Sequence, residues 1–315
     1  MSNYDGTGHD ALRRASRRAF LGAIAGSATA GFMAGAAAGA ALGYRASPPP
    51  PVVDGPKRFA GKVVLVTGGT SGIGRASVIA FADAGADVVF CGRREARGRE
   101  VEREAARRGG SARFVRADVR DPEQVRALVD GIVQRHGRLD VAFNNAGIYG
   151  NRPFHEMPLA EFDDIQATNV RGTFLCMQAQ LPVMLAQGGG TIIVTSSVQE
   201  LATRPGSVAY AASKRALVAL VKVAALEYGA RGIRVNAICP GTIDTPMVRQ
   251  GAAATLPDPA WGIASRQWAK DNVPGVQRMG TPEEIARAVL WMASDEMSYL
   301  NGAAVVVDGG MTTAL

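Results

Sequence analysis

Hydrophobic and polar positions are arranged in blocks along most of this chain, with short apolar runs separated by longer stretches of mixed character. The apolar runs are rich in β-branched residues and rarely alternate with polar ones, which is typical of strands buried on both faces of a sheet. We predict strands at Val63–Thr67, Val88–Cys91, Arg113–Ala117, Val141–Asn144, Thr191–Thr195, Arg234–Ile238 and Ala304–Val307. We predict helices between them at Arg75–Ala84, Arg94–Arg108, Pro122–His136, Glu161–Ala186, Val208–Tyr228 and Pro282–Ser294. Strands that alternate with helices predict an α/β fold, a doubly wound parallel sheet of about seven strands flanked by helices in a single domain.

The N-terminal segment follows a different pattern. A polar, basic stretch that ends at Arg17 and Arg18 precedes a run from Ala19 to Gly43 that contains no charged residue. This order of segments is typical of an export signal, and Ser16–Leu21 resembles the twin-arginine signal of bacteria. An uncleaved membrane anchor is an alternative, because the uncharged run is long enough to span a bilayer. A disordered Ala-rich extension with a chance pair of arginines is another.

The pattern divides the chain into three parts. We assign residues 1–46 to a twin-arginine-type signal or a membrane anchor, residues 47–56 to a Pro-rich linker, and residues 57–315 to the folded domain. The signal predicts passage through the twin-arginine export machinery to the periplasm or the membrane surface, with an N-terminal membrane anchor as the alternative.

Composition narrows the possible functions. The chain has 315 residues, of which 47% are hydrophobic, so it can bury a sizeable core. Three cysteines and three scattered histidines argue against a disulfide framework and a metal site. The net charge of +7 is partly an effect of the N-terminal arginines, and no basic stripe with interleaved aromatic residues is found. We therefore expect no nucleic-acid partner.

A glycine-rich turn follows the first predicted strand. Its glycines are Gly68, Gly69, Gly72 and Gly74, and a helix is predicted to begin at Arg75. Glycines allow a tight turn and let backbone N–H groups approach a pyrophosphate, and the helix N-terminus adds partial positive charge. The position directly after the first strand favours a dinucleotide site over an ordinary loop.

Four polar side chains form a candidate catalytic set. Tyr210 and Lys214 are four residues apart in a predicted helix, so their side chains share one face. A nearby ammonium lowers the pKa of a phenol from its usual value of about 10 and suits it to acid–base work. Ser197 follows a predicted strand and could hold a substrate oxygen beside the phenol, and Asn169 lies in the helix Glu161–Ala186. Taken singly, each feature has a simpler interpretation. The Tyr–Lys pair could lie on a helix surface, the serine could form a turn, and the asparagine could be an exposed helix residue.

Taken together, the glycine spacing and the order Asn169, Ser197, Tyr210 and Lys214 resemble the classical short-chain dehydrogenase/reductase family over residues 57–315. The resemblance implies a Rossmann-like fold and hydride transfer between a nicotinamide and the carbon of a secondary alcohol or ketone. It implies that Tyr210 is the general acid/base, that Lys214 lowers its pKa and holds the nicotinamide ribose, that Ser197 orients the substrate, and that Asn169 maintains a water-linked proton path to Lys214.

The resemblance also implies cofactor contacts at the ends of the strands. Asp118 and Val119 would lie beside the adenine, and Asn145, Ala146 and Gly147 beside the adenosine ribose. A Pro-Gly turn would lie near the nicotinamide. The full set is Gly68, Thr70, Ser71, Gly72, Ile73, Gly74, Arg93, Arg94, Asp118, Val119, Asn145, Ala146, Gly147, Tyr210, Lys214, Pro240, Gly241, Ile243 and Thr245.

The end of the second strand bears on the choice between NAD and NADP. An acidic residue there would bind the ribose 2′-hydroxyl of NAD, but the position holds Gly92, followed by Arg93 and Arg94. Arginine can pair with a 2′-phosphate, so we predict NADP over NAD. The alternative is that both arginines only begin the next helix.

The region 246–280, which we call the lid, resembles the family's mobile substrate lid. Its Trp261 and Trp268 would form an apolar wall for the substrate or pack against a neighbouring subunit. The resemblance implies a homo-oligomer, a tetramer or a dimer, assembled through the helices that carry Asn169 and Tyr210. Two other functions remain open: a dinucleotide-binding sensor without turnover, and isomerase or lyase chemistry on the same fold.

Overall fold

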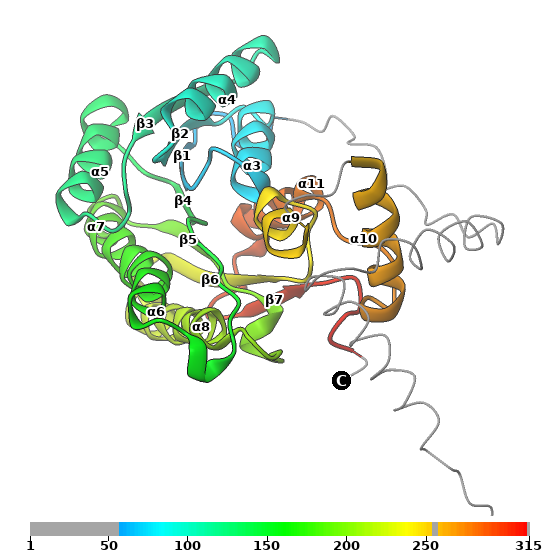
Figure 1. Ribbon diagram of the computed structural model, residues 1–315. Coiled ribbons are helices and arrows are strands. Elements are labelled where there is room, and N and C mark those ends of the chain that lie inside the picture. Colours follow the sequence, from blue (N-terminus) through cyan, green and yellow to red (C-terminus); the bar gives the residue numbers. More distant parts are fainter. Residues whose placement is uncertain (1–56, 254–257, 314–315) are drawn as a thin grey trace, which may run out of the picture.

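The computed structural model describes residues 57–253 and 258–313, and its centre is a parallel sheet of seven strands (Figure 1). The order across the sheet is β3-β2-β1-β4-β5-β6-β7. The strands are β1 (Val63–Thr67), β2 (Asp87–Gly92), β3 (Ser111–Arg116), β4 (Val141–Asn144), β5 (Gly190–Thr195), β6 (Ile233–Pro240) and β7 (Ala304–Val307). The predicted single α/β domain with a doubly wound sheet is confirmed.

Helices cover both faces of the sheet, as the continuous apolar strands require. On one face α3 (Gly72–Asp83), α4 (Glu95–Arg107) and α11 (Pro282–Ala293) pack against side chains such as Val64 and Val66. On the other face α5 (Pro122–His136), α7 (Gly172–Ala186) and α8 (Val208–Tyr228) pack against Val63 and Leu65. Successive residues of β1 therefore belong to two different cores.

The strand order places a crevice at the carboxyl edge of the sheet. From β1 the chain moves outward through β2 and β3, and then returns to β4 on the other side of β1. The connections on the two sides of this point run in opposite directions, so their loops diverge and leave a binding crevice. The glycine turn after Thr67 and the loops after Asn144, Thr195 and Pro240 all end at this edge.

The predicted helix Glu161–Ala186 is not continuous. The structure has α6 (Leu159–Gln166), one turn of π-helix at Ala167–Arg171, and then α7. A π turn holds an extra residue, which changes the face that following side chains occupy. Asn169, predicted in a regular helix, lies inside this turn and is fully buried.

The lid contains two helices that the sequence did not predict, α9 (Pro246–Ala253) and α10 (Asp258–Asn272). The C-terminal half of α10 forms a small separate core, in which Trp268, Ala269 and Val273 pack with Met279 and Met311. Figure 1 shows α10 set apart from the sheet. The lid therefore has a small apolar core of its own, separate from the two cores of the sheet.

The predictions for residues 1–46 and 47–56 lie outside the described residues. Among the helices of 57–253 and 258–313, none combines the length and the apolar character that crossing a membrane requires.

Candidate active site

The glycine turn between β1 and α3 is shaped for a close backbone approach. Gly68 has a φ of +68°, and a Cβ there would lie 2.9 Å from the Cα of Ala146. A Cβ on Gly74 would lie 2.3 Å from the carbonyl oxygen of Gly68. Ser71 precedes α3, but its side chain makes no capping hydrogen bond, so the first N–H groups of this helix stay available to an anion. The turn thus fits the pyrophosphate of a dinucleotide. Ile73, by contrast, packs against the core beneath the turn.

The loop after β4 is tied to the glycine turn through Thr67. Its hydroxyl accepts hydrogen bonds from the amides of Asn145 and Ala146, both at 3.0 Å. The Asn145 side chain donates to the Thr67 carbonyl at 3.2 Å and accepts from the Thr195 hydroxyl at 3.3 Å. Asn145 therefore joins the ends of β1, β4 and β5, and it holds Ala146 and Gly147 at the crevice.

The buried Asn169 side chain connects the crevice loop to α8. Its Oδ1 accepts from the Ile148 amide at 2.8 Å, and its Nδ2 donates to the Ile148 carbonyl and to Ser213 Oγ, both at 3.0 Å. Both amide hydrogens are thus used, and only a lone pair on Oδ1 remains for a water. A Cβ on Gly147 would lie 3.2 Å from that Oδ1 and 3.7 Å from Lys214 Nζ, so the glycine keeps the space between them open.

Lys214 lies on α8 with only 3% of its surface exposed. Its Nζ donates a hydrogen bond to the Thr195 carbonyl at 2.7 Å, at the end of β5. Burial lowers the pKa of Lys214 to about 8, because the charged form loses its hydration. The amine therefore titrates close to physiological pH.

Tyr210 lies one helical turn before Lys214, whose Nζ is 5.3 Å from the centre of the phenol ring. Burial raises the pKa of Tyr210 to about 12, and a hydrogen bond with the Ser197 side chain acts in the opposite direction. The lowered pKa expected from Lys214 is thus not found. Desolvation of the phenolate outweighs the nearby charges, among which Arg204 lowers the pKa.

Ser197 follows β5 and precedes the short 3₁₀ turn Val198–Glu200. Its Oγ accepts from the Gln199 amide at 3.2 Å, so the hydroxyl hydrogen is directed elsewhere. The structure therefore brings together the four predicted residues from three places: Asn169 from the π turn, Ser197 from the loop after β5, and Tyr210 and Lys214 from α8. The arrangement can exchange a proton with an oxygen atom placed between Ser197 and Tyr210.

Two residues of this region lie in loops expected to form the pocket but were not among the predicted site residues. Tyr149 presents its ring edge-on to Tyr210, with ring centres 5.0 Å apart and an angle of 77° between the planes. Gln199 is buried, and its Oε1 has no hydrogen-bond partner among the described residues. The only sequence signal for Tyr149 was its place two residues after Gly147, in a loop that ends at the crevice.

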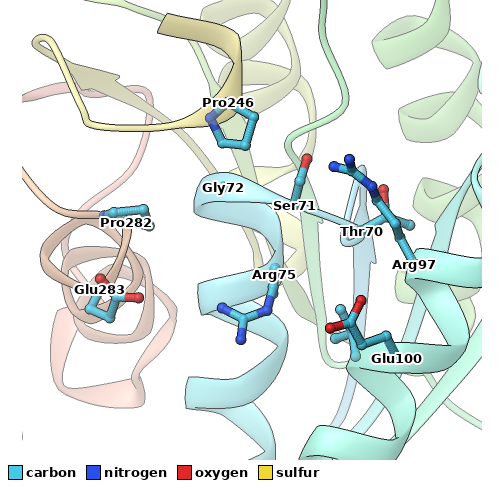
Figure 2. A pocket seen from close by; sticks show the side chains of 10 residues that line it. Thr70, Ser71, Gly72, Arg75, Arg97, Glu100, Pro246, Pro282 and Glu283 are labelled. Carbon is cyan, nitrogen blue, oxygen red and sulfur yellow. The ribbon is translucent and has the colours of Figure 1, made fainter. Parts of the chain in front are cut away.

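The adenosine side of the turn carries a group of arginines. Arg94 donates hydrogen bonds to Thr70 Oγ1 at 2.9 Å and Ser71 Oγ at 2.7 Å. Burial lowers the pKa of Arg94, and the neighbouring charges of Arg97 and Arg93 lower it further. Arg97, which was not predicted, projects from α4 into a cavity of about 410 Å³ that runs from Ser71 across α3 (Figure 2).

Asp118, predicted beside the adenine, is already paired. Arg120 donates to its carboxylate from Nε at 3.0 Å and from Nη2 at 2.6 Å, and this pairing lowers the pKa of Asp118. Arg120 also binds Asp164 of α6 at 2.6 Å. An adenine amino group would share the carboxylate with Arg120. Val119 beside it is buried.

The turn after β6 reaches back to the glycine turn. The Gly241 amide donates to the Val307 carbonyl at 3.0 Å, and a Cβ on Gly241 would lie 2.8 Å from the Cα of Asp308. Thr245 Cγ2 is 3.2 Å from the position that a Cβ would take on Gly72. Of the residues predicted near the nicotinamide, Thr245 approaches the glycine turn and Gly241 packs against Asp308. Pro240 ends β6, and Ile243 is buried in the core that contains Val64 and Val66.

Comparisons with known proteins agree with this geometry. A family profile described as enoyl-(acyl carrier protein) reductase matches residues 68–312. The chain is 38% identical over 267 residues to a 3beta-hydroxysteroid dehydrogenase of Mediterraneibacter gnavus, covering 81% of this chain and 96% of that protein. It is 42% identical to an A-factor type gamma-butyrolactone 1′-reductase of Streptomyces virginiae, covering 80% and 95%.

Solved structures show the same likeness. The crystal structure of a levodione reductase has a TM-score of 0.77 at 37% identity and covers 82% of this chain and all of that one. A short-chain type dehydrogenase/reductase from Mycobacterium marinum has a TM-score of 0.74 at 38% identity, covering 81% of this chain and 97% of the other. The match extends over the glycine turn, the crevice and the lid, and the chain belongs to the classical short-chain dehydrogenase/reductase family.

Proposed function

We propose that this chain is an NAD(P)(H)-dependent oxidoreductase that interconverts a secondary alcohol and a ketone. The observation that carries the proposal is that the partly buried Tyr210 phenol lies beside the Ser197 hydroxyl and the Lys214 amine, next to a glycine turn with the close approaches that a dinucleotide requires. The relatives are named as dehydrogenases and reductases, which supports the same class of reaction.

Tyr210 and Ser197 act on the substrate oxygen. Because the pKa of Tyr210 is about 12, its phenol is protonated at neutral pH and can donate a proton to a carbonyl oxygen as that oxygen gains negative charge. The Ser197 hydroxyl stabilises the same oxygen and fixes its position. A nicotinamide held beside the glycine turn would supply or accept the hydride at the adjoining carbon.

Lys214 and Asn169 support the proton transfer. The Lys214 ammonium stabilises the charge left on Tyr210 after the proton moves, and it would hold the nicotinamide ribose. The Asn169 side chain bonds to the loop at Ile148 and to Ser213, the residue that precedes Lys214, and so holds both in place. The free lone pair on its Oδ1 supports a water-linked path for protons towards Lys214.

A substrate screen tests this function. The full-length protein is incubated with ketones or secondary alcohols and each nicotinamide cofactor, and the absorbance of the reduced nicotinamide is followed. We expect a change that scales with enzyme concentration and is lost in Tyr210→Phe. Cofactor binding without turnover of any compound would favour a sensor, and product formation without an absorbance change would favour an isomerase or lyase.

The finer choice of cofactor rests on the arginines. The end of β2 carries three positive charges, from Arg93, Arg94 and Arg97. Among the contacts of the described residues, the Arg94 guanidinium bonds only to the hydroxyls of Thr70 and Ser71. Crowded like charges are unfavourable without an anion. The 2′-phosphate of NADP would supply one, and we therefore propose NADP as the preferred cofactor.

Assembly with further copies of this chain is proposed through α7 and α8. An apolar groove of about 490 Å³ lies there between Val170, Phe174 and Leu220, and 46% of the Phe174 surface is exposed. A homodimer or homotetramer would bury this groove, which is adjacent to the π turn that carries Asn169. Mass measurement in solution tests it: we expect an oligomer that Phe174→Glu dissociates, and a monomeric parent protein would contradict the proposal.

Export through the twin-arginine machinery is proposed from the residues around Arg17 and Arg18. Sequencing the N-terminus of the protein from fractionated cells tests it. Cleavage near residue 40 in a periplasmic fraction would support a processed signal. An intact N-terminus in the membrane fraction would support the anchor, and an intact N-terminus in the cytoplasm would contradict both.

A further inference from the structure

A polar cluster joins both lid helices to the turn that lies near the nicotinamide. Arg249 of α9 donates to both carboxylate oxygens of Asp244, from Nε at 2.8 Å and from Nη2 at 3.0 Å. The indole Nε1 of Trp261, on α10, donates to Asp244 Oδ1 at 3.2 Å. The Arg249 guanidinium also lies over the Trp261 ring, 5.6 Å from its centre. One carboxylate thus binds two helices that the chain connects only through residues 254–257.

Asp244 occupies a position that is itself well fixed. Its amide donates to the Gly280 carbonyl at 2.9 Å, and Ile243 forms a bridge with Gly280. The next residue, Thr245, contacts the glycine turn at Gly72 and accepts the amide hydrogen of Arg249 at its carbonyl. The polar cluster therefore connects the lid to a segment in contact with the dinucleotide turn.

The two ends of α10 are held by interactions of different kinds. The C-terminal end is held by apolar packing of Trp268, Ala269 and Val273 against Met279 and Met311. The N-terminal end is held by the Trp261 side chain, which is 6% exposed, and by Asp244, whose ion pair with Arg249 is one-third to one-half exposed. Partly exposed ion pairs are weak and are screened by salt, whereas buried apolar contacts are not. The N-terminal end of α10, together with α9, is therefore the end whose attachment depends on a charged contact.

We propose that Asp244 is a positioning residue that fastens α9 and the N-terminal half of α10 over the crevice, and that this fastening sets the affinity for the ketone or alcohol substrate. The inference rests on the proposed oxidoreductase function. Asp244 touches none of Asn169, Ser197, Tyr210 and Lys214 among the contacts described for them, so its loss acts on substrate capture and leaves proton transfer intact.

Hydrogen exchange of the full-length protein tests the fastening without any turnover. In Asp244→Asn, we expect amides of α9 and the first half of α10 to exchange at least about tenfold faster, while amides of β1, β4 and the Trp268 cluster keep their rates. Raising the salt concentration from about 0.05 M to about 1 M should speed the same amides in the parent protein and have little effect on the variant. Trp261→Phe, which removes one donor and keeps the ring, should give a smaller change.

Steady-state kinetics give the second measurement. With any substrate found in the screen, Asp244→Asn should raise KM about tenfold and change kcat less than about threefold. Arg126→Gln is the matched control, because Arg126 forms an exposed ion pair with Glu123 at 2.9 Å on α5, remote from the lid. It should change neither exchange in the lid nor KM.

The outcomes separate this inference from the proposed function. Unchanged lid exchange in Asp244→Asn, or faster exchange throughout the sheet as well, would overturn the fastening whether or not the protein turns over a substrate. Faster lid exchange in a protein that turns over nothing would retain the fastening and overturn the proposed function. A fall in kcat with unchanged KM would overturn the role in substrate affinity.

Discussion

The catalytic floor, formed by Asn169, Ser197, Tyr210 and Lys214, and the lid at 246–280 lie on the same crevice but are built in different ways. The floor is held by buried hydrogen bonds to backbone groups at strand ends, such as the bond of Lys214 to Thr195. The lid is held by a small apolar cluster and a partly exposed ion pair. The main core therefore fixes the proposed catalytic groups, while weaker contacts hold the segment proposed to cover the substrate.

The largest effect is expected at the floor. Tyr210→Phe removes the hydroxyl that we propose as the proton donor, and we expect kcat to fall about 1,000-fold or more, because general acid catalysis contributes about 100- to 10,000-fold. Tyr149→Phe is the matched control, since its ring meets Tyr210 edge-on and its hydroxyl lies 3.4 Å from Ser207 Oγ instead. If Tyr210→Phe were as active as this control, the proposed role of Tyr210 in proton transfer would be wrong.

A smaller but still large effect is expected at the adenosine side, which belongs to the rigid part of the crevice. Arg94→Glu replaces a guanidinium that bonds Thr70 and Ser71 with a carboxylate. We expect the ratio of kcat/KM with NADPH to that with NADH to fall about 100-fold, because charged hydrogen bonds are worth about 1.5–3 kcal/mol. Glu123→Gln on α5 serves as the control. An unchanged ratio would mean that Arg94 only supports the turn.

The pH dependence sharpens the comparison, because the floor titrates through Lys214. Its pKa of about 8 leaves the amine charged below pH 8 and neutral above it. The kcat/KM for ketone reduction should therefore be highest below pH 8 and fall about tenfold per pH unit above it. Tyr210 stays protonated throughout, since its pKa is about 12. Lys214→Arg should move the fall to higher pH, and an unshifted profile in that variant would assign the titration to another group.

The smallest effect on global stability is expected in the lid. Leu217→Ala, in the core that carries the floor, should lower the free energy of unfolding by about 3 kcal/mol, because it leaves a cavity in a fully buried site. Trp268→Ala, although it removes a larger side chain, should leave the main denaturation midpoint nearly unchanged and loosen only the lid. Equal shifts of the midpoint in the two variants would mean that floor and lid unfold as one unit.

The sequence predicted the sheet and most helices well, because long apolar strands and a periodic helix such as Val208–Tyr228 depend on local pattern. It failed where tertiary contacts decide. Nothing in the residues 161–186 marks a π turn, and the Ala, Gly and Pro content of 246–272 hid α9 and α10. The contacts that hold these helices join distant parts of the chain: α10 packs against Met279 and Met311, and Arg249 of α9 lies over the Trp261 ring of α10.

The sequence predicted which residues would meet at the candidate site, but not the protonation behaviour and bonding partners of all of them. The spacing of Tyr210 and Lys214 placed them together, yet the direction of the phenol pKa depends on burial, which spacing does not reveal. In the same way, the arginine that occupies the Asp118 carboxylate and the approach of Arg97 to the cavity depend on side-chain directions. Residue identity suggested the groups, and packing determined their charges and partners.

The π turn at Ala167–Arg171 makes the length of this segment a constraint in its own right. It holds one residue more than a regular helix would need, and that residue allows Asn169 to point inward between Ile148 and Ser213. Deleting a single residue there would let α6 and α7 join as an unbroken helix and would remove the wide turn that directs Asn169 inward. The shortened chain would gain a more regular helix but lose the Asn169 amide from the catalytic floor. Helix stability therefore favours the shorter segment, and the proposed chemistry favours the longer one.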